Sequence, residues 1–155
     1  MPAPQFGEPE PGRAYRDRAA AFAVVVHEER LALVRVEERN GRRGVLDLPG
    51  GGIDPGETAR AAATRETAEE AGLRVELEAE PFAQADHYFH PDPGRYVNTR
   101  GAFFAGRLVA EAPELKTEPD HALVWMAPHE ALAALDRESH AWAVAAWLRR
   151  LRKRP

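Results

Sequence analysis

Residues 51–73 read GGIDPGETARAAATRETAEEAGL, and this stretch contains the clearest helix of the chain. A helix is predicted over residues 58–71, because Thr58 can cap its N-terminus and its interior is rich in alanine. Gly72 follows at the position where a left-handed C-terminal residue is favoured. The fold is therefore expected to contain one well-defined helix directly after a glycine-rich segment.

Three glutamates of this helix are spaced so that they share one edge. Glu66 precedes Glu69 by three residues and Glu70 by four, and at about 100° per residue their side chains project from the same side. Like charges at these spacings repel, and the helix dipole disfavours anions in the last turn. A divalent cation would reverse this repulsion, since it binds several oxygen ligands. The alternative is a solvated charged face, on which Arg65 pairs with Glu69.

The glycines before the helix favour the interpretation as a metal site. Residues 49–52 read Pro-Gly-Gly-Gly and are expected to form a loop that continues to a Pro-Gly turn at residues 55–56. Without a Cβ atom, glycine backbone can approach an anion or a metal closely. Magnesium is typically held by a few carboxylates, waters and substrate phosphates, so the glycines, the glutamates and Arg65 together suit a site for magnesium and phosphate.

This segment resembles the Nudix box, whose pattern is G-x5-E-x7-R-E-U-x-E-E-x-G-U, with U a bulky aliphatic residue. The strictly fixed letters all match, and a chance match is on the order of one in 10^8 at average residue frequencies. One position departs, because Thr67 stands where an aliphatic residue is usual, on the side expected to face a sheet. The matching residues are Gly51, Glu57, Arg65, Glu66, Glu69, Glu70, Gly72 and Leu73.

The resemblance implies a fold, a reaction and a cofactor. Nudix proteins are α/β/α sandwiches with a mixed β-sheet between helices, and the order of elements over residues 20–150 resembles that arrangement. Members hydrolyse a nucleoside diphosphate linked to another group, with magnesium or manganese as the cofactor. The implied metal ligands are the side chains of Glu66, Glu69 and Glu70, with a carbonyl oxygen of Gly50 or Gly51.

The resemblance also implies catalytic roles. Glu66, or a glutamate further along the chain, would help to deprotonate the attacking water, and Arg65 would orient a glutamate with Glu57 as its partner. Outside the box, Glu118 precedes the last predicted strand, where this family often supplies a further metal ligand or base. A solvated acidic turn is an equally good interpretation of Glu118.

Four residues near or on predicted strands are candidates for contact with the substrate. Aromatic rings on a hairpin can stack on a base, although aromatic residues in strands more often pack in the core. Arginines can bind phosphate or sugar, although solvated arginines are commoner. The candidates are Arg43, Tyr88, Arg100 and Phe103.

The chain is expected to form a single α/β domain over residues 17–155, after a disordered tail over residues 1–16 in which four prolines prevent regular structure. A short helix is predicted at residues 128–135 and an amphipathic helix at residues 139–152, so that helices cover both faces of a mixed sheet. Apolar runs and alternating patterns predict strands at residues 19–27, 31–37, 45–48, 73–78, 82–89, 96–109 and 123–126.

Composition excludes several classes of protein. The chain has no cysteine, which excludes a disulfide framework, a thiolate zinc site and a cysteine nucleophile. Its formal net charge of −4 argues against a protein that coats nucleic acid. Its apolar runs are too short to span a bilayer, and its N-terminus has no secretory pattern. We therefore expect a cytoplasmic monomer or homodimer that binds a small nucleotide, with neither a nucleic-acid polymer nor a membrane as its partner.

The leading hypothesis is a metal-dependent hydrolase that cleaves the pyrophosphate linkage of a nucleoside triphosphate, a nucleotide sugar or a dinucleoside polyphosphate. A small nucleoside di- or triphosphate is slightly favoured among these substrates. A hypothesis of a different class is a Nudix-fold module that senses nucleotides without turnover, which the intact glutamates of the box argue against. A third hypothesis, an acidic structural domain, predicts that magnesium changes neither thermal stability nor activity.

Overall fold

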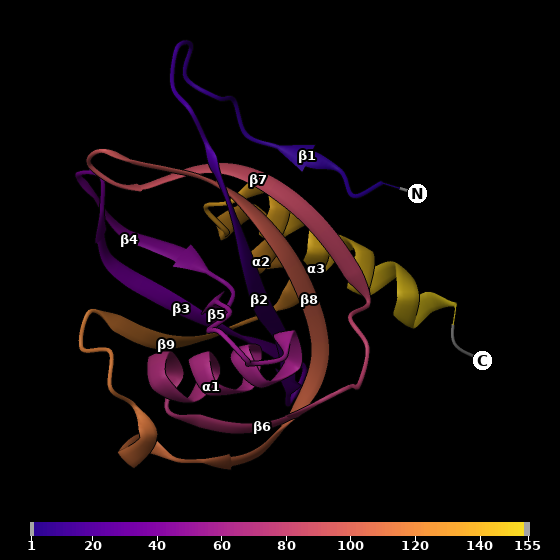
Figure 1. Ribbon diagram of the computed structural model, residues 1–155. Coiled ribbons are helices and arrows are strands. Elements are labelled where there is room, and N and C mark those ends of the chain that lie inside the picture. Colours follow the sequence, from indigo (N-terminus) through magenta and orange to yellow (C-terminus); the bar gives the residue numbers. More distant parts are fainter. Residues whose placement is uncertain (1, 154–155) are drawn as a thin grey trace.

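The computed structural model describes residues 2–153, and these residues form a nine-stranded sheet with three α-helices and one 3-10 helix (Figure 1). The helices are α1 (Ala59–Ala71), α2 (Pro128–Ala134) and α3 (Glu138–Arg152), and the 3-10 helix is Pro113–Leu115. The strands are β1 (Gln5–Phe6), β2 (Arg16–His27), β3 (Arg30–Arg39), β4 (Arg42–Asp47), β5 (Gly50–Gly52), β6 (Leu73–Leu77), β7 (Ala83–Asp92), β8 (Arg95–Glu111) and β9 (His121–Met126).

The sheet is mixed, as the sequence predicts. Its strands follow the order β1-β7-β8-β2-β3-β4, with β5 paired to β2, β6 to β8 and β9 to β3. β2 runs parallel to β8, whereas the pairs β2–β3 and β7–β8 are antiparallel. This pairing places β2, the strand with the longest buried run, in the middle of the molecule.

The two faces of β2 carry separate hydrophobic cores. Phe22 and Val24 belong to a cluster that packs beneath α2 and α3, whereas Ala23 and Val25 belong to a cluster beneath α1. Side chains alternate along a strand, so a strand buried on both faces reads as a continuous apolar run. Figure 1 shows α1 on one face of the sheet and α3 on the other, which confirms the prediction of helices on both faces.

Helix α1 begins and ends where the capping residues predict. The Thr58 hydroxyl oxygen accepts a hydrogen bond from the Ala61 N–H at 3.1 Å. Gly72 has a φ of 67°, and its N–H donates to the Ala68 carbonyl oxygen at 2.9 Å. Both ends of the helix are therefore fixed by local sequence, which fixes where its glutamates point.

The glycines before α1 form strand β5 instead of the expected loop. Residues 50–52 pair antiparallel with residues 20–22 of β2. Gly50 has a φ of 149°, and a Cβ atom there would lie 2.2 Å from the Ala21 carbonyl oxygen, which no side chain tolerates. The prediction of a loop was wrong here, because pairing with β2 overrides the low strand propensity of glycine.

The segment before β2 also differs from the expectation of disorder over residues 1–16. Gln5–Phe6 forms β1, which pairs parallel with β7. The Gln5 amide donates to the Asn98 side-chain oxygen at 2.9 Å, and the Phe6 ring lies 5.9 Å from the Trp142 ring. These contacts hold the N-terminal segment against the rest of the protein, although its prolines prevent longer regular structure. Residue 1 lies outside the described residues.

The turn between β3 and β4 is tighter than the strands predicted at residues 31–37 and 45–48 imply, since these leave residues 38–44 between them. β3 continues to Arg39 and β4 starts at Arg42, which leaves Asn40 and Gly41 as the turn. Both turn residues have positive φ, of 49° and 78°, the conformation of a hairpin turn whose twist matches the flanking strands.

No helix within residues 2–153 is long and apolar enough to cross a membrane, and localisation in the cytoplasm stays a prediction.

Thr67, the residue that departs from the box, is buried with 0% exposure, and its hydroxyl donates to the Ala63 carbonyl at 2.7 Å. We expect Thr67→Val to change the free energy of unfolding by less than about 1 kcal/mol, because the Ala63 carbonyl keeps the helical hydrogen bond from the Thr67 N–H. Urea unfolding measures this. Thr64→Val is the matched control, because Thr64 makes the same bond to the Arg60 carbonyl at a half-buried position. A loss above about 2 kcal/mol for Thr67→Val alone would contradict the expectation.

Candidate active site

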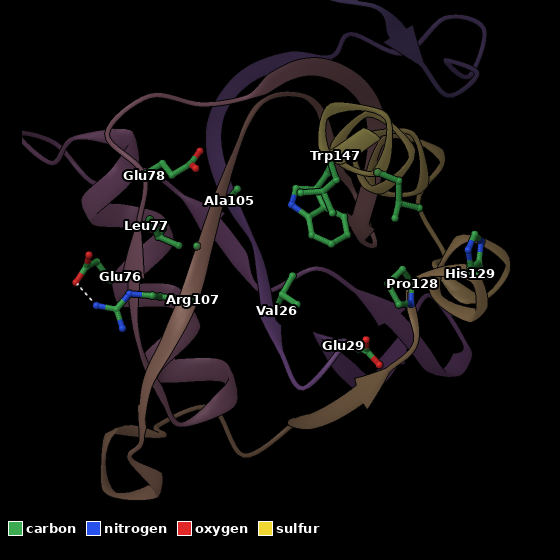
Figure 2. Close-up of a pocket in the computed structure, with 13 residues that line it drawn as sticks. Val26, Glu29, Glu76, Leu77, Glu78, Ala105, Arg107, Pro128, His129 and Trp147 are labelled. Carbon is green, nitrogen blue, oxygen red and sulfur yellow. Dashed lines mark hydrogen bonds and ion pairs between the residues drawn. The ribbon is translucent and has the colours of Figure 1, made fainter. Parts of the chain in front are cut away.

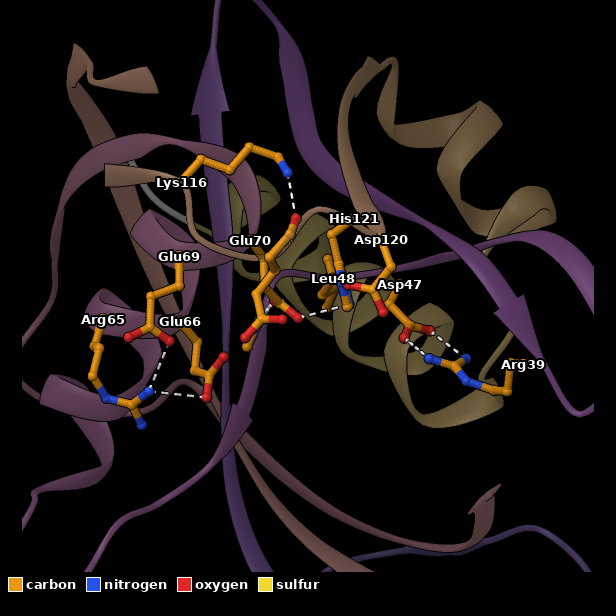
Figure 3. A network of polar contacts seen from close by, with 12 residues as sticks. Arg39, Asp47, Leu48, Arg65, Glu66, Glu69, Glu70, Lys116, Asp120 and His121 are labelled. Atoms are coloured by element: carbon orange, nitrogen blue, oxygen red, sulfur yellow. Dashed lines mark hydrogen bonds and ion pairs between the residues drawn. The ribbon is translucent and has the colours of Figure 1, made fainter. Parts of the chain in front are cut away.

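A cleft of about 270 Å³ opens beside β5 and the second half of α1. Gly50–Gly52 form part of its wall, and Glu66 and Glu70 reach it from α1. Figure 3 shows Glu70 projecting from the helix towards His121, and Glu66 next to Arg65. Asp120 and His121 also line the cleft. The cleft thus joins two segments of the box to the start of β9.

Glu66 lies against the backbone of Gly51. A Cβ atom on Gly51 would lie 3.0 Å from the carboxyl carbon of Glu66, so glycine is needed for this approach. Burial raises the pKa of Glu66, and the charge of Glu70 raises it further. One carboxylate oxygen, Oε1, accepts from Arg65 Nη1 at 3.0 Å, while within residues 2–153 no hydrogen bond reaches Oε2. Glu66 therefore offers an oxygen to a ligand in the cleft.

Glu70 is fixed by hydrogen bonds on both carboxylate oxygens. Oε1 accepts from the Gly50 N–H at 2.9 Å, and Oε2 lies 3.0 Å from His121 Nε2. The other ring nitrogen of His121, Nδ1, lies 2.9 Å from an oxygen of Asp120. Only an imidazolium donates from both nitrogens, and the bond to Glu70 raises the pKa of His121 to about 9. Burial raises the pKa of Glu70, and the hydrogen bond to His121 opposes that shift.

Arg65 connects the turn before α1 to the glutamates on it. Its Nε and Nη2 atoms donate to the two carboxylate oxygens of Glu57 at 2.8 and 2.9 Å, a bidentate pair. These hydrogen bonds lower the pKa of Glu57 to about 2. Nη1 donates to Glu66 and also to Glu69 Oε2 at 3.1 Å (Figure 3). The side chain of Glu69 thus faces Arg65 and does not line the cleft, whereas Glu66 does both.

A second ionic network, which sequence reasoning missed, lines the cleft opposite the glutamates. Asp47 is 5% exposed and accepts hydrogen bonds from Arg39 and Arg137. Burial alone would raise the pKa of Asp47, but the charge of Arg137 and the bonds from Arg39 hold it well below its usual range. The Arg137 guanidinium carbon lies 3.7 Å from the centre of the Phe89 ring. An aspartate inside the apolar strand over residues 45–48 was the one available sequence signal.

The donor set of the cleft fits a divalent cation. Glu66 and Glu70 bring two carboxylates into the partly buried cleft, where the charge of Glu70 raises the pKa of Glu66, and Gly51 lets the backbone come close. Magnesium and manganese prefer such oxygen ligands. Ligand atoms of Glu118, Asp120 and His121 also lie within 4.8 Å of one another. Glu118 does not line the cleft, and its N–H donates to the Glu69 carbonyl oxygen at 3.0 Å.

The two arginines predicted to bind substrate lie outside the lining of this cleft. Arg43 is an exposed residue of β4, opposite Glu38 on β3. The Arg100 guanidinium pairs with Asp86 at 2.8 Å and with Asp17 at 3.2 Å. The geometry therefore gives the predicted contacts of these residues no support.

The two predicted aromatic contacts also lie outside the cleft lining. Tyr88 packs edge-on against Tyr15, with ring centres 5.1 Å apart. Phe103 is 1% exposed and stacks on Phe22 at 5.4 Å, so it is a core residue that no substrate reaches. The aromatic residues that do line the cleft are Phe22 and Phe89.

A larger cavity of about 710 Å³ lies elsewhere, between β8 and α3 (Figure 2). Its lining includes the apolar side chains of Val26, Leu77 and Trp147, and three acidic residues, which are Glu29, Glu76 and Glu78. The glutamates of the box do not line it. By volume alone, this cavity would be chosen as the candidate active site. The titratable groups that shift one another's pKa values, however, lie in the smaller cleft.

The chain is similar to known proteins both in sequence and in structure. A model of the NUDIX domain matches residues 16–148. A Bacillus subtilis (strain 168) protein named "Putative 8-oxo-dGTP diphosphatase" is 30% identical over 109 residues, covering 70% of this chain and 65% of that protein. An Erythrobacter litoralis (strain HTCC2594) protein named "RNA pyrophosphohydrolase" is 36% identical over 97 residues, covering 59% of this chain and 54% of that protein. The chain thus matches between about half and two thirds of the length of these relatives.

Solved structures agree on the fold. A NUDIX hydrolase from Nitrosomonas europaea has a TM-score of 0.72 at 20% identity, covering 85% of this chain and 88% of that one. A sequence identity of 20% supports a shared architecture and nothing more. That shared architecture confirms the predicted α/β/α sandwich. The domain match contains the whole box, from Gly51 to Leu73, and most of the chain around it. The chain therefore belongs to the NUDIX domain family.

Proposed function

We propose that this protein is a metal-dependent pyrophosphohydrolase, which cleaves the pyrophosphate linkage of a nucleoside diphosphate linked to another group. The observation that carries the proposal is the meeting of Glu66 and Glu70 in one cleft beside the backbone of Gly51. The names of the two curated relatives, a diphosphatase and a pyrophosphohydrolase, support the reaction class. The intact box argues against a module that only senses nucleotides.

Glu66 and Glu70 are the proposed ligands of magnesium or manganese, with a carbonyl oxygen of Gly50 or Gly51. When bound, the ion would neutralise phosphate charge and make a coordinated water more acidic. Glu69 is a further proposed ligand, although its carboxylate pairs with Arg65 in this structure. The proposed proton acceptor is Glu66, whose Oε2 is available and whose pKa is raised, or alternatively Glu118.

Arg65 is a proposed positioning residue rather than a catalytic one, because it contacts Glu57, Glu66 and Glu69 and does not line the cleft. We expect Arg65→Lys to raise the magnesium concentration for half-maximal activity by about 10–100-fold, the usual cost of losing a hydrogen-bonding partner of a metal ligand. A lysine cannot make the bidentate bond to Glu57. Magnesium titrations of activity and of melting temperature measure the effect.

Arg60→Lys is the matched control for that variant. Arg60 lies on the same helix and donates to the Leu77 carbonyl through Nε and Nη2, away from the cleft. We expect its magnesium dependence to equal that of the wild type. An unchanged magnesium midpoint in Arg65→Lys as well would remove Arg65 from the metal site.

A substrate screen tests the function directly. The purified chain is incubated with nucleoside triphosphates, nucleoside diphosphate sugars and dinucleoside polyphosphates, in magnesium, manganese or EDTA. Release of nucleoside monophosphate, phosphate or pyrophosphate that requires the metal would support hydrolysis. Tight nucleotide binding without any product would favour the sensor, and a melting temperature and activity indifferent to magnesium would favour an acidic structural domain.

A further inference from the structure

A second polar cavity, of about 410 Å³, adjoins the catalytic cleft and shares Arg18 with it. The cavity lies where the first residues of β2 pair with the first residues of β8, with Arg16 opposite Val97. Arg16 and Arg95 contribute two further guanidinium groups to its lining. Three arginines therefore surround a hollow that continues the cleft beyond β5.

Arg18 lies close to the proposed metal ligands. A Cβ atom on Gly52 would lie 2.5 Å from Nη2 of Arg18, so the guanidinium rests against the backbone of Gly52. The neighbouring Gly51 faces the Glu66 carboxylate in the same way. The end of β5 thus has a carboxylate on one side and a cation on the other. An extended anion bound at the metal ligands would pass directly to Arg18.

The guanidinium groups of this cavity make few ion pairs within the described residues. Arg16 and Arg18 make no ion pair within residues 2–153, and Arg95 pairs only with Asp92, at 3.7 Å. Asp17 also lines the cavity, but its carboxylate pairs with Arg100 at 3.2 Å. Burial lowers the pKa of Arg18 and repulsion from the charge of Arg95 lowers it further, while the carboxylates of Glu66 and Asp54 oppose that shift. An anion would relieve this repulsion, as a cation relieves that between the glutamates.

The aromatic ring in the cavity lining does not offer a free stacking platform. Tyr96 stacks on His90, with ring centres 4.4 Å apart and an angle of 10° between the planes. The Arg13 guanidinium carbon lies 5.1 Å from the centre of the same ring. The cavity therefore presents charged hydrogen-bond donors, the chemistry that recognises phosphate rather than a base.

We propose that Arg16, Arg18 and Arg95 form an anion subsite for phosphate groups that continue past the diphosphate held at the metal ligands. The proposal rests on the proposed function for its location relative to the cleaved bond. The substrate class that uses both sites is a nucleoside polyphosphate with at least about three phosphates. A nucleoside diphosphate sugar, whose second end is uncharged, would leave the subsite unused.

Binding of inorganic tripolyphosphate in EDTA tests the subsite without the metal. We expect calorimetry to show binding to the wild type, and Arg18→Gln combined with Arg95→Gln to weaken it at least about 10-fold. Arg30→Gln is the control, because Arg30 is an exposed arginine at the start of β3, paired with His27 at the end of β2 that lies away from the cavity. Arg95→Gln alone changes an exposed side chain and guards against a folding defect in the double variant. Equal binding by the wild type and by both variants would overturn the proposal.

Kinetics separate a phosphate subsite from a general structural role. We expect the KM for a nucleoside triphosphate to rise at least about 10-fold in Arg18→Gln, and the KM for a nucleoside diphosphate sugar to rise by a clearly smaller factor, because Arg18 also lines the cleft. Arg18→Lys, which keeps the charge, should recover part of the loss. Equal rises in KM for both substrates would assign Arg18 to the shared diphosphate and overturn the subsite.

The two proposals fail in different ways. A chain that hydrolyses none of the substrates but binds tripolyphosphate through Arg18 and Arg95 would contradict the proposed function and keep the subsite. A chain that hydrolyses nucleotides, but whose tripolyphosphate binding and KM values do not depend on these arginines, would keep the function and remove the subsite.

Discussion

Glu70→Gln is expected to lower kcat by at least about 100-fold while the protein stays folded. The glutamine keeps a carbonyl oxygen that can accept the hydrogen bond from the Gly50 N–H, so the contact between α1 and β5 survives. The carboxylate charge is lost, and with it one proposed ligand of the cation. A bound cation contributes several kcal/mol to stabilising charge in the transition state, and each 1.36 kcal/mol corresponds to about tenfold in rate.

Stability and metal binding are measured alongside kcat for this variant. We expect the free energy of unfolding to change by less than about 2 kcal/mol, because His121 keeps Asp120 as a partner at 2.9 Å. The rise in melting temperature on adding magnesium should shrink or vanish. Glu76→Gln is the control, since Glu76 is an exposed glutamate that pairs with Arg107 on the neighbouring strand. Normal turnover in Glu70→Gln would refute its role as a metal ligand.

The parts of the site that could be predicted from sequence are those fixed by local geometry. The spacing of Glu66 and Glu70 is set by the helical repeat, and the helix is bounded by Thr58 and Gly72, whose roles depend on nearest neighbours alone. The same applies to the bond between Arg65 and Glu57, which spans one turn and the first half of a helix. Such elements keep their geometry in any tertiary context that buries one face of the helix.

The parts that could not be predicted depend on segments far apart in the chain. Three arginines that line the cleft come from distant segments: Arg18 lies on β2, Arg39 lies on β3, and Arg137 directly precedes α3. Only the folded sheet brings them together. Phe103 shows the converse, because strand alternation fixes which residues share a face but does not say which face a helix covers. The sequence alone does not show whether an arginine or an aromatic residue contacts a substrate or another side chain.

Asp47→Asn is expected to cost about 3–5 kcal/mol of stability, the largest loss that we predict for one conservative change. The asparagine has nearly the same shape but leaves the buried guanidinium of Arg137 without its counter-charge. Arg39 keeps Asp136 at 3.3 Å as a remaining partner. For a domain of this size the loss corresponds to a fall in melting temperature of about 6–20 °C. Asp92→Asn, which removes an exposed charge, should change stability by less than about 1 kcal/mol.

The pH dependence of that loss identifies its cause. The pKa of Asp47 in the folded protein lies below its ordinary value of 3.8, so its contribution to stability is complete above about pH 4 and declines as the pH falls further. The difference in unfolding free energy between the wild type and Asp47→Asn should therefore shrink in acid, as urea titrations at pH 7 and pH 3 would measure. A difference that stays constant with pH would mean that the asparagine disturbs packing and that the carboxylate charge is not what holds Arg39 and Arg137 at the cleft.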